Sequence, residues 1–287
     1  MTRGVICALG LAVAAAASAG PAVAQALITQ PQRYLLTTDV FDGRAVWVQP
    51  AGLARRREAS IAWSLTGEHR AGTTTLEQYG LTFASSGAAL GWQRAELDDG
   101  SHVSQWAIGY GGGGPRASAG VTRRWLKGER VHDAVWDVGA RYAPKPFLEL
   151  SATWRDIGSP RVQAPDTLPT SLDTTYTSTV TPAAALTLLG GRARIAAETD
   201  LLTDGWKRRA ARAGAAVALP WGLGLHVRAA FDGDLAFRQL AVALTWSGAS
   251  ARMTGFGSFP QEGSDARYYG VWGSAVKDLE PRAPGWR

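Results

Sequence analysis

The sequence predicts an all-β fold: an antiparallel, transmembrane β-barrel of about 14 strands, preceded by a short N-terminal plug segment. Three observations support this prediction. The chain starts with a segment typical of a secretory signal peptide, apolar and polar residues alternate with a period of two over most of the rest, and short turns alternate with longer loops. Although 46% of the residues are hydrophobic, no apolar run after the first segment is long enough for a membrane-spanning helix.

Residues 1–24 are predicted to be a signal peptide that is removed on export. Arg3 gives the segment a positive start, residues 4–17 form a short apolar core, and the run from Ala22 to Ala24 is a small-residue cleavage motif. The only cysteine of the chain, Cys7, lies in this segment. The mature chain is therefore expected to hold no disulfide and no cysteine-bound metal.

The period-two pattern is clearest between residues 135 and 155. From 135 to 142 the even-numbered residues are apolar or small, whereas Asp137 and Arg141 lie on the opposite face. Successive side chains of a strand point to opposite faces, so each such run is expected to be a strand with one apolar and one polar face. The segments expected to be strands are 58–68, 73–85, 87–97, 102–110, 116–126, 131–143, 147–156, 174–188, 191–200, 208–219, 222–231, 235–246, 249–257 and 265–275.

The connections between these segments alternate in length, as they do in outer-membrane barrels. Tight turns such as residues 144–146 and 220–221 alternate with longer or more charged connections, of which Ile157 to Asp173 is the longest. A loop of that length is either functional or disordered. The expected organisation is a signal peptide at 1–24, a plug or leader at 25–57, the barrel at 58–275 and a C-terminal tail at 276–287.

The polar face of the strands carries charges of both signs. An arginine or lysine that faces lipid near the bilayer midplane costs about 2–4 kcal/mol, so these side chains are expected to line the lumen or lie near the rim. Two interpretations stay open: the charges pair across the lumen and stiffen the wall, which we favour, or they line a route for polar or anionic solutes. The expected lumen-lining residues are Asp137, Arg141, Glu149, Arg155, Arg192, Arg194, Glu198, Arg212, His226 and Arg228.

The chain holds 12 tryptophans, and many of those on the expected strands lie near strand ends. Indole rings prefer the interface between lipid headgroups and hydrocarbon, which favours a membrane barrel. The alternative is a water-soluble β-sandwich whose core the tryptophans fill. The alternation of turns and the charged face favour the barrel.

No pattern of catalytic, cofactor-binding or metal-ligating residues is present. The four histidines are scattered, and neither an H-E-x-x-H nor a G-x-S-x-G motif occurs. The glycine run 111–114 lacks the lysine and helix of a phosphate loop and is expected to be a tight turn. The formal charge of +6 comes from arginines spread along the chain, which does not favour nucleic-acid binding. We expect no enzyme activity, no cofactor and no metal.

The segment from Asp42 to Ala54, with its core P-A-G-L-A, resembles the N-terminal signature of the FadL and PorV group of outer-membrane barrels. Residues 138–160 resemble the hairpin repeated in that group. Gln49 stands where the group usually has asparagine, and the chain continues past the last expected strand. The resemblance implies that residues 35–54 pack inside the barrel as a plug, as opposed to a flexible leader. The expected plug residues are Val46, Trp47, Pro50, Ala51, Gly52 and Leu53.

The resemblance implies that the protein lies in the outer membrane and contacts outer-membrane lipid. It leads to two functional hypotheses. The first is a channel for hydrophobic or amphipathic small molecules, with an apolar pocket between plug and wall. The second is a non-conducting scaffold or secretion-associated barrel, similar to PorV, that docks a partner protein and has a sealed lumen.

Overall fold

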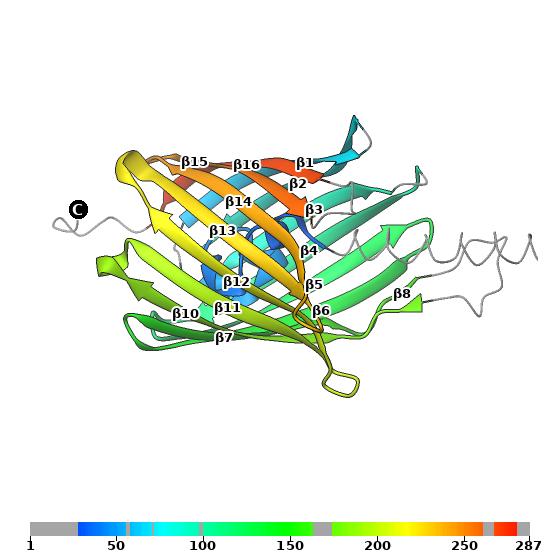
Figure 1. Ribbon diagram of the computed structural model, residues 1–287, viewed down its shortest axis with the longest axis horizontal. Coiled ribbons are helices and arrows are strands. Elements are labelled where there is room, and N and C mark those ends of the chain that lie inside the picture. Colours follow the sequence, from blue (N-terminus) through cyan, green and yellow to red (C-terminus); the bar gives the residue numbers. More distant parts are fainter. Residues whose placement is uncertain are drawn as a thin grey trace, which may run out of the picture.

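The computed structural model describes residues 28–55, 58–70, 72–97, 100–162, 174–260 and 267–279. Within these residues, fourteen antiparallel strands form a closed barrel, and the first and last strands, β1 and β16, pair with each other (Figure 1). The predicted signal peptide and most of the predicted C-terminal tail lie outside the described residues. No helix among the described residues has the length and apolar character needed to span a membrane.

The strands follow one another around the barrel in chain order, except that two short strands, β8 (Arg161–Val162) and β9 (Thr174–Thr175), form a separate pair in the longest connection. The barrel strands are β1 (Glu58–Arg70), β2 (Thr73–Ser85), β3 (Ala88–Glu96), β4 (His102–Gly113), β5 (Ala117–Gly128), β6 (His132–Lys145), β7 (Leu148–Ile157), β10 (Thr179–Leu188), β11 (Ala193–Leu202), β12 (Arg208–Ala218), β13 (Leu223–Asp232), β14 (Phe237–Ser247), β15 (Ala251–Pro260) and β16 (Arg267–Asp278).

The predicted fold class, a closed antiparallel barrel of fourteen strands, is confirmed. Most strand boundaries differ from the expected ones by one to three residues, and two of the differences are instructive. The run predicted as one strand from residue 174 is split, because residues 174–175 pair with β8 and the barrel strand β10 begins only at Thr179. Strand β16 continues to Asp278 rather than 275, because Glu58 and Ala59 at the start of β1 pair with Asp278 and Lys277.

The two faces of each strand differ as period two requires. On β6, Trp136 and Val138 are exposed on the outer surface, whereas Asp137 and Arg141 are buried. Exposed large apolar side chains recur in this way around the outer surface, for example at Ile61 of β1. An outer wall of exposed apolar residues around a polar interior suits lipid and not water, and it excludes the water-soluble sandwich.

Connections at one end of the barrel, here called the turn end, have two to four residues: 86–87, 114–116, 146–147, 189–192, 219–222 and 248–250. At the opposite end, the loop end, connections such as 97–101 and 203–207 are longer, and the longest runs from residue 158 to 178. Its central residues, 163–173, lie outside the described residues. The predicted alternation of length is therefore seen only in part, because the connections 129–131 and 233–236 at the loop end are as short as the turns at the other end.

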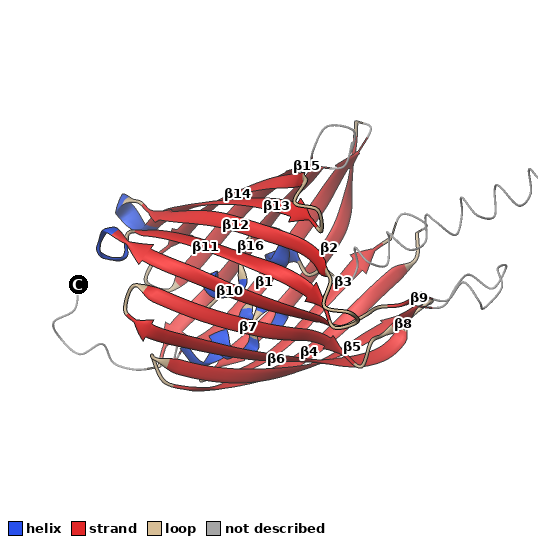
Figure 2. Cartoon of the chain, turned by 60° about the horizontal axis from the view of Figure 1, so that its bottom comes forward, coloured by secondary structure: helices blue, strands red, loops and turns tan. Residues whose placement is uncertain are grey.

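Residues 28–55, here called the N-terminal segment, lie inside the barrel (Figure 2). Its helical turns are η1 (Gln30–Arg33), η2 (Thr37–Asp39), α2 (Ala45–Val48) and η3 (Pro50–Arg55). Buried apolar side chains of the segment, among them Tyr34, Val46 and Trp47, form one cluster with inward residues of the wall such as Phe256. Tyr34 stacks on Phe256 with ring centroids 4.6 Å apart. This cluster is the main hydrophobic core of the described chain.

The outward direction of Val138 leads to a test of the lipid-facing wall. Val138 lies at the middle of β6, so Val138→Arg is expected to destabilise the folded barrel in a bilayer by about 2–4 kcal/mol. Phe147→Arg, in the turn 146–147, is the matched control and is expected to cost about 0–1 kcal/mol. Urea-induced unfolding of both variants in lipid vesicles measures the difference, and equal costs would contradict the assigned outer face.

Candidate functional site

The candidate site is the lumen, where arginines of the wall hold the main chain of the N-terminal segment. Arg141 on β6 donates to the carbonyl oxygens of Val40 (3.0 Å) and Thr38 (3.1 Å). Arg155 on β7 donates to the carbonyl of Trp47 at 3.0 Å, and Arg228 on β13 donates to that of Gln32. Hydrogen bonds from charged donors are stronger than neutral ones. These contacts fix the path of the segment from opposite parts of the wall.

Glu149 on β7 is the carboxylate around which several of these arginines gather. It is buried and accepts hydrogen bonds from Arg141 and, at 3.0 Å, from Arg55 of the segment. Arg194 on β11 lies 3.4 Å from the same carboxylate. The guanidinium of Arg141 also lies 4.1 Å from the ring centroid of Phe41, a cation–π geometry. One wall carboxylate thus contacts three cations from the wall and the segment.

Glu198 on β11 ties a second part of the segment to the wall. Its carboxylate accepts from the backbone N–H of Thr37 (2.7 Å) and from the Thr37 hydroxyl (2.9 Å). Arg212 on β12 bonds both Glu198 and Asp200. Burial raises the pKa of the Asp39 carboxyl, and its ion pair with Arg194 at 3.0 Å opposes this rise.

The direction in which the pKa of Asp39 shifts determines how this carboxyl group affects the free energy of unfolding. A carboxyl with a raised folded-state pKa favours the folded state at acidic pH, and this contribution is lost as the pH rises through that pKa. The ion pair with Arg194 at 3.0 Å offsets part of the cost of burying the charged form of Asp39.

A third cluster lies on β5 to β7 and includes an arginine that sequence analysis did not single out. Arg124 is fully buried and bonds Asp137 (2.7 Å from Nε, 3.1 Å from Nη2) and Asp156. Thr122 and Leu126, two residues away on the same strand, are buried as well. The alternation along β5 therefore predicts that Arg124 points inward. The adjacent Arg123 made the two faces of this strand hard to tell apart from sequence.

The residues expected in the plug are placed on α2 and η3, and all six are buried. The Trp47 indole N–H donates to the hydroxyl of Thr82 at 3.1 Å, and Ser118 donates to the carbonyl of Ala51 at 3.1 Å. The wall strands approach so closely here that they need glycine. A Cβ added at Gly91 would lie 2.8 Å from Trp47 Cε2, and one at Gly120 would lie 2.7 Å from the backbone nitrogen of Ala51.

Gln49, the residue that departs from the family pattern, is fully buried against the wall. Its side-chain amide donates to the carbonyl oxygens of Ala140 (3.3 Å) and Ala152 (3.2 Å) on β6 and β7. A Cβ at Gly139 would overlap its amide oxygen. The side chain of Gln49 therefore occupies the space that is free because residue 139 is glycine.

Of the charges expected to line the lumen, eight lie on the inner face and Arg192 does not. Strand β11 begins at Ala193, so Arg192 belongs to the exposed turn between β10 and β11. The expectation for Arg192 was wrong because the strand start was placed two residues too early. The histidine, His226, lies on the inner face of β13 and lines a small cavity of about 130 Å³ near Asp42 and Arg44.

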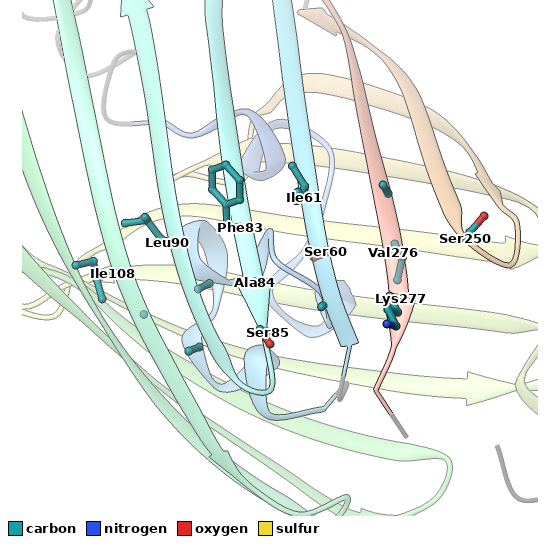
Figure 3. A pocket seen from close by; sticks show the side chains of 15 residues that line it. Ser60, Ile61, Phe83, Ala84, Ser85, Leu90, Ile108, Ser250, Val276 and Lys277 are labelled. Atoms are coloured by element: carbon teal, nitrogen blue, oxygen red, sulfur yellow. The ribbon is translucent and has the colours of Figure 1, made fainter. Parts of the chain in front are cut away.

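Two kinds of hollow are found in the described part of the structure. Inside the barrel, a polar cavity of about 240 Å³ lies at the loop end between Gln32 and Arg33 of the segment and Arg212 of the wall. On the outer wall, an apolar groove of about 940 Å³ crosses β1 to β4 and β16, and Figure 3 shows Ile61, Phe83, Leu90 and Ile108 along it. A similar groove of about 740 Å³ crosses β14 to β16 and continues onto β1 and β2. The apolar hollows thus face lipid, and the internal ones are polar.

Within the described residues, no group of three or more histidine, cysteine, aspartate or glutamate side chains is placed to hold a metal ion. The buried carboxylates are instead engaged by arginines, as at Asp137 and Glu149. The interior arrangement is therefore suited to holding a peptide segment and to binding polar groups.

No protein-family model matches the sequence, and no curated protein matches it. Solved structures do match. The toluene transporter TbuX of Ralstonia pickettii aligns with a TM-score of 0.52 at 9% identity, over 82% of this chain and 92% of that one. The toluene transporter TodX of Pseudomonas putida gives 0.51 at 10% identity, over 85% and 94%. The monoaromatic hydrocarbon channel CymD gives 0.52 at 8% identity, over 84% and 94%.

The fold is that of a FadL-like outer-membrane β-barrel. The loose resemblance predicted from residues 42–54 and 138–160 is thereby confirmed at the level of the fold, which is all that such low identity shows. The names of these neighbours describe channels and transporters.

Proposed function

We propose that this protein is an outer-membrane channel for small hydrophobic or amphipathic molecules, and that the N-terminal segment is its plug. The observation that carries the proposal is the cavity of about 240 Å³ between the segment and the wall at the loop end. A solute can enter there between the N-terminal segment and the wall, which are joined by hydrogen bonds that can break and re-form. The neighbours whose names describe hydrocarbon channels and toluene transporters support the same reading.

The chemistry of the cavities favours amphipathic solutes over purely hydrophobic ones. The internal cavity at the loop end is lined by hydroxyl, amide and charged groups, including Thr179, Thr181 and Gln239. The large apolar grooves lie on the outer wall. A solute without polar groups would leave these internal donors and acceptors without partners, which costs free energy.

One observation favours the alternative, a non-conducting scaffold that docks a partner protein. At the turn end the segment packs against glycines of β3 to β6 too closely for any other side chain, as at Gly91 and Gly120. A lumen that is permanently closed there would not pass a solute. The two functions therefore differ in whether the segment moves.

A reversible tether tests this difference. A Cβ at Gly43 would lie 3.2 Å from the Cβ of Ala84 on β2, close to the spacing of a disulfide, so Gly43→Cys with Ala84→Cys can link segment and wall. The pair is introduced with Cys7→Ser. In liposomes, the reduced protein is expected to pass phenyl glucoside, a neutral amphipathic solute, several-fold faster than the oxidised protein, because the tether holds the plug in place.

A disulfide between two wall strands is the control. Ala119 and Ala140 are register partners on β5 and β6 and both are exposed on the outer face, so cysteines there leave the segment free. Oxidation of this second pair is expected to leave uptake unchanged. If reduced protein passes no solute in either variant, the channel is contradicted and the scaffold gains support.

A further inference from the structure

The cavity at the loop end has a formal excess of three positive charges among its lining residues. Its arginines come from the N-terminal segment and from three strands of the wall, β7, β12 and β13, whereas only two aspartates line the same cavity. The charged residues that line the cavity are Arg33, Arg155, Arg209, Arg212, Arg228, Asp156 and Asp200.

The ion pairs around the cavity do not remove this excess. Asp200 is engaged by Arg212, and Asp156 by Arg124, which does not line the cavity. Among the residues that the structure describes, no carboxylate lies within 4.0 Å of the guanidinium nitrogens of Arg155, Arg209 or Arg228. Three cations of one small cavity therefore lack an ion-pair partner in the described chain.

Hydrogen-bonding groups of the same arginines are also unsatisfied. Within the described part of the chain, the Nε–H groups of Arg33, Arg155 and Arg228 are buried and have no hydrogen-bond partner. Arg33 and Arg228 are each only 6% exposed. A buried charged donor that loses its water without gaining an acceptor is strongly disfavoured. The cavity is thus lined by more positive than negative charge, and three of its arginines also have a buried Nε–H group without an acceptor among the described residues.

We propose that this cavity binds a small oxyanion, a carboxylate or a phosphate. The planar guanidinium presents N–H groups in a fixed fork that matches two oxygen atoms of such an anion. The polar side chains of Tyr176 and Thr179 line the same cavity. With about 240 Å³ and a mostly polar lining, the cavity suits a compact anion and not a long acyl chain. Binding at this site does not depend on whether the barrel conducts.

Calorimetric titration of the detergent-solubilised protein tests the proposal at fixed ionic strength, with benzoate, its neutral analogue benzamide, and inorganic phosphate as probes. Benzoate or phosphate is expected to bind, and benzamide is not. Arg228→Gln removes a buried charged donor and is expected to weaken binding about tenfold or more. The control is Arg192→Gln, which makes the same change of charge in the exposed turn and is expected to leave binding unchanged.

Because Arg228 also holds the carbonyl of Gln32, a second variant separates binding from folding. Arg209→Gln alters an exposed lining residue, and it is expected to weaken binding while the heat-modifiable mobility of the barrel stays unchanged. Phosphate binding without benzoate binding would assign an inorganic oxyanion, and the reverse a carboxylate. No binding of either anion, equal binding of benzamide, or equal losses in Arg192→Gln would overturn the proposal.

Discussion

Deletion of residues 28–55 is expected to turn a barrel that is closed or nearly closed into an open pore. The segment contributes most of the buried apolar side chains of the lumen, and a wall of this strand number encloses a space wide enough for water once it is removed. The strand ladder closes without the segment, because β1 pairs directly with β16. Single-channel conductance of the refolded protein in planar bilayers, with and without these residues, measures the change.

A point substitution provides a milder version of the same test. Gly120→Leu places a side chain where the backbone of Pro50 and Ala51 now lies, so the segment is expected to be displaced and conductance to rise. Gly255→Leu is the control, since a Cβ there meets open space on the outer face of β15. If the deletion folds as a heat-modifiable barrel and remains as closed as the full chain, the segment is not the plug.

Glu149→Ala is expected to give the largest loss of stability among single substitutions in the lumen. It removes the carboxylate shared by Arg141, Arg55 and Arg194. Breaking a buried ion pair from one side leaves an uncompensated charge and typically costs about 3–5 kcal/mol. Here more than one cation loses its partner, so the upper part of that range is expected. The urea midpoint of unfolding in lipid vesicles measures the loss.

Glu96→Ala is the matched control for that experiment. Glu96 pairs with Arg94 at 2.8 Å, but both side chains are 33% exposed, and exposed pairs contribute about 0–1 kcal/mol. A conductance record of Glu149→Ala is informative as well, because a loosened segment should flicker between closed and open levels. Equal urea midpoints for the two variants would show that the cluster around Glu149 does not hold the segment.

The wall of the barrel could be predicted from sequence because the direction of each side chain follows from its neighbours along the chain. In β6 and β7 the alternation of residues such as Val138 with Asp137 assigns each side chain to lipid or lumen without knowledge of any distant residue. The tight turns separate the strands in the same local way. Errors occurred where a boundary depends on a partner strand, as at Arg192 and at the start of β10.

The candidate site was predictable only in part. The motif from Pro50 to Leu53 marked the segment that lies inside, and the inner charges were identified individually. The pairing of these charges could not be predicted from sequence, since partners such as Glu149 and Arg55 are 94 residues apart. Phe41 was missed because its role depends on contacts with arginines of the wall, whereas the inward direction of Arg124 could have been inferred from the alternation of β5.

The sequence by itself determined the barrel, its strands and the sidedness of its wall, because period-two alternation between lipid and lumen is imposed residue by residue. Only the tertiary structure decided that the interior cavities are polar, that arginines of the wall hold the carbonyls of the segment, and that Arg155 and Arg228 lack an ion-pair partner among the described residues. Charge compensation in a closed barrel depends on distances across the lumen, and these are set by closure of the whole sheet rather than by neighbours along the chain.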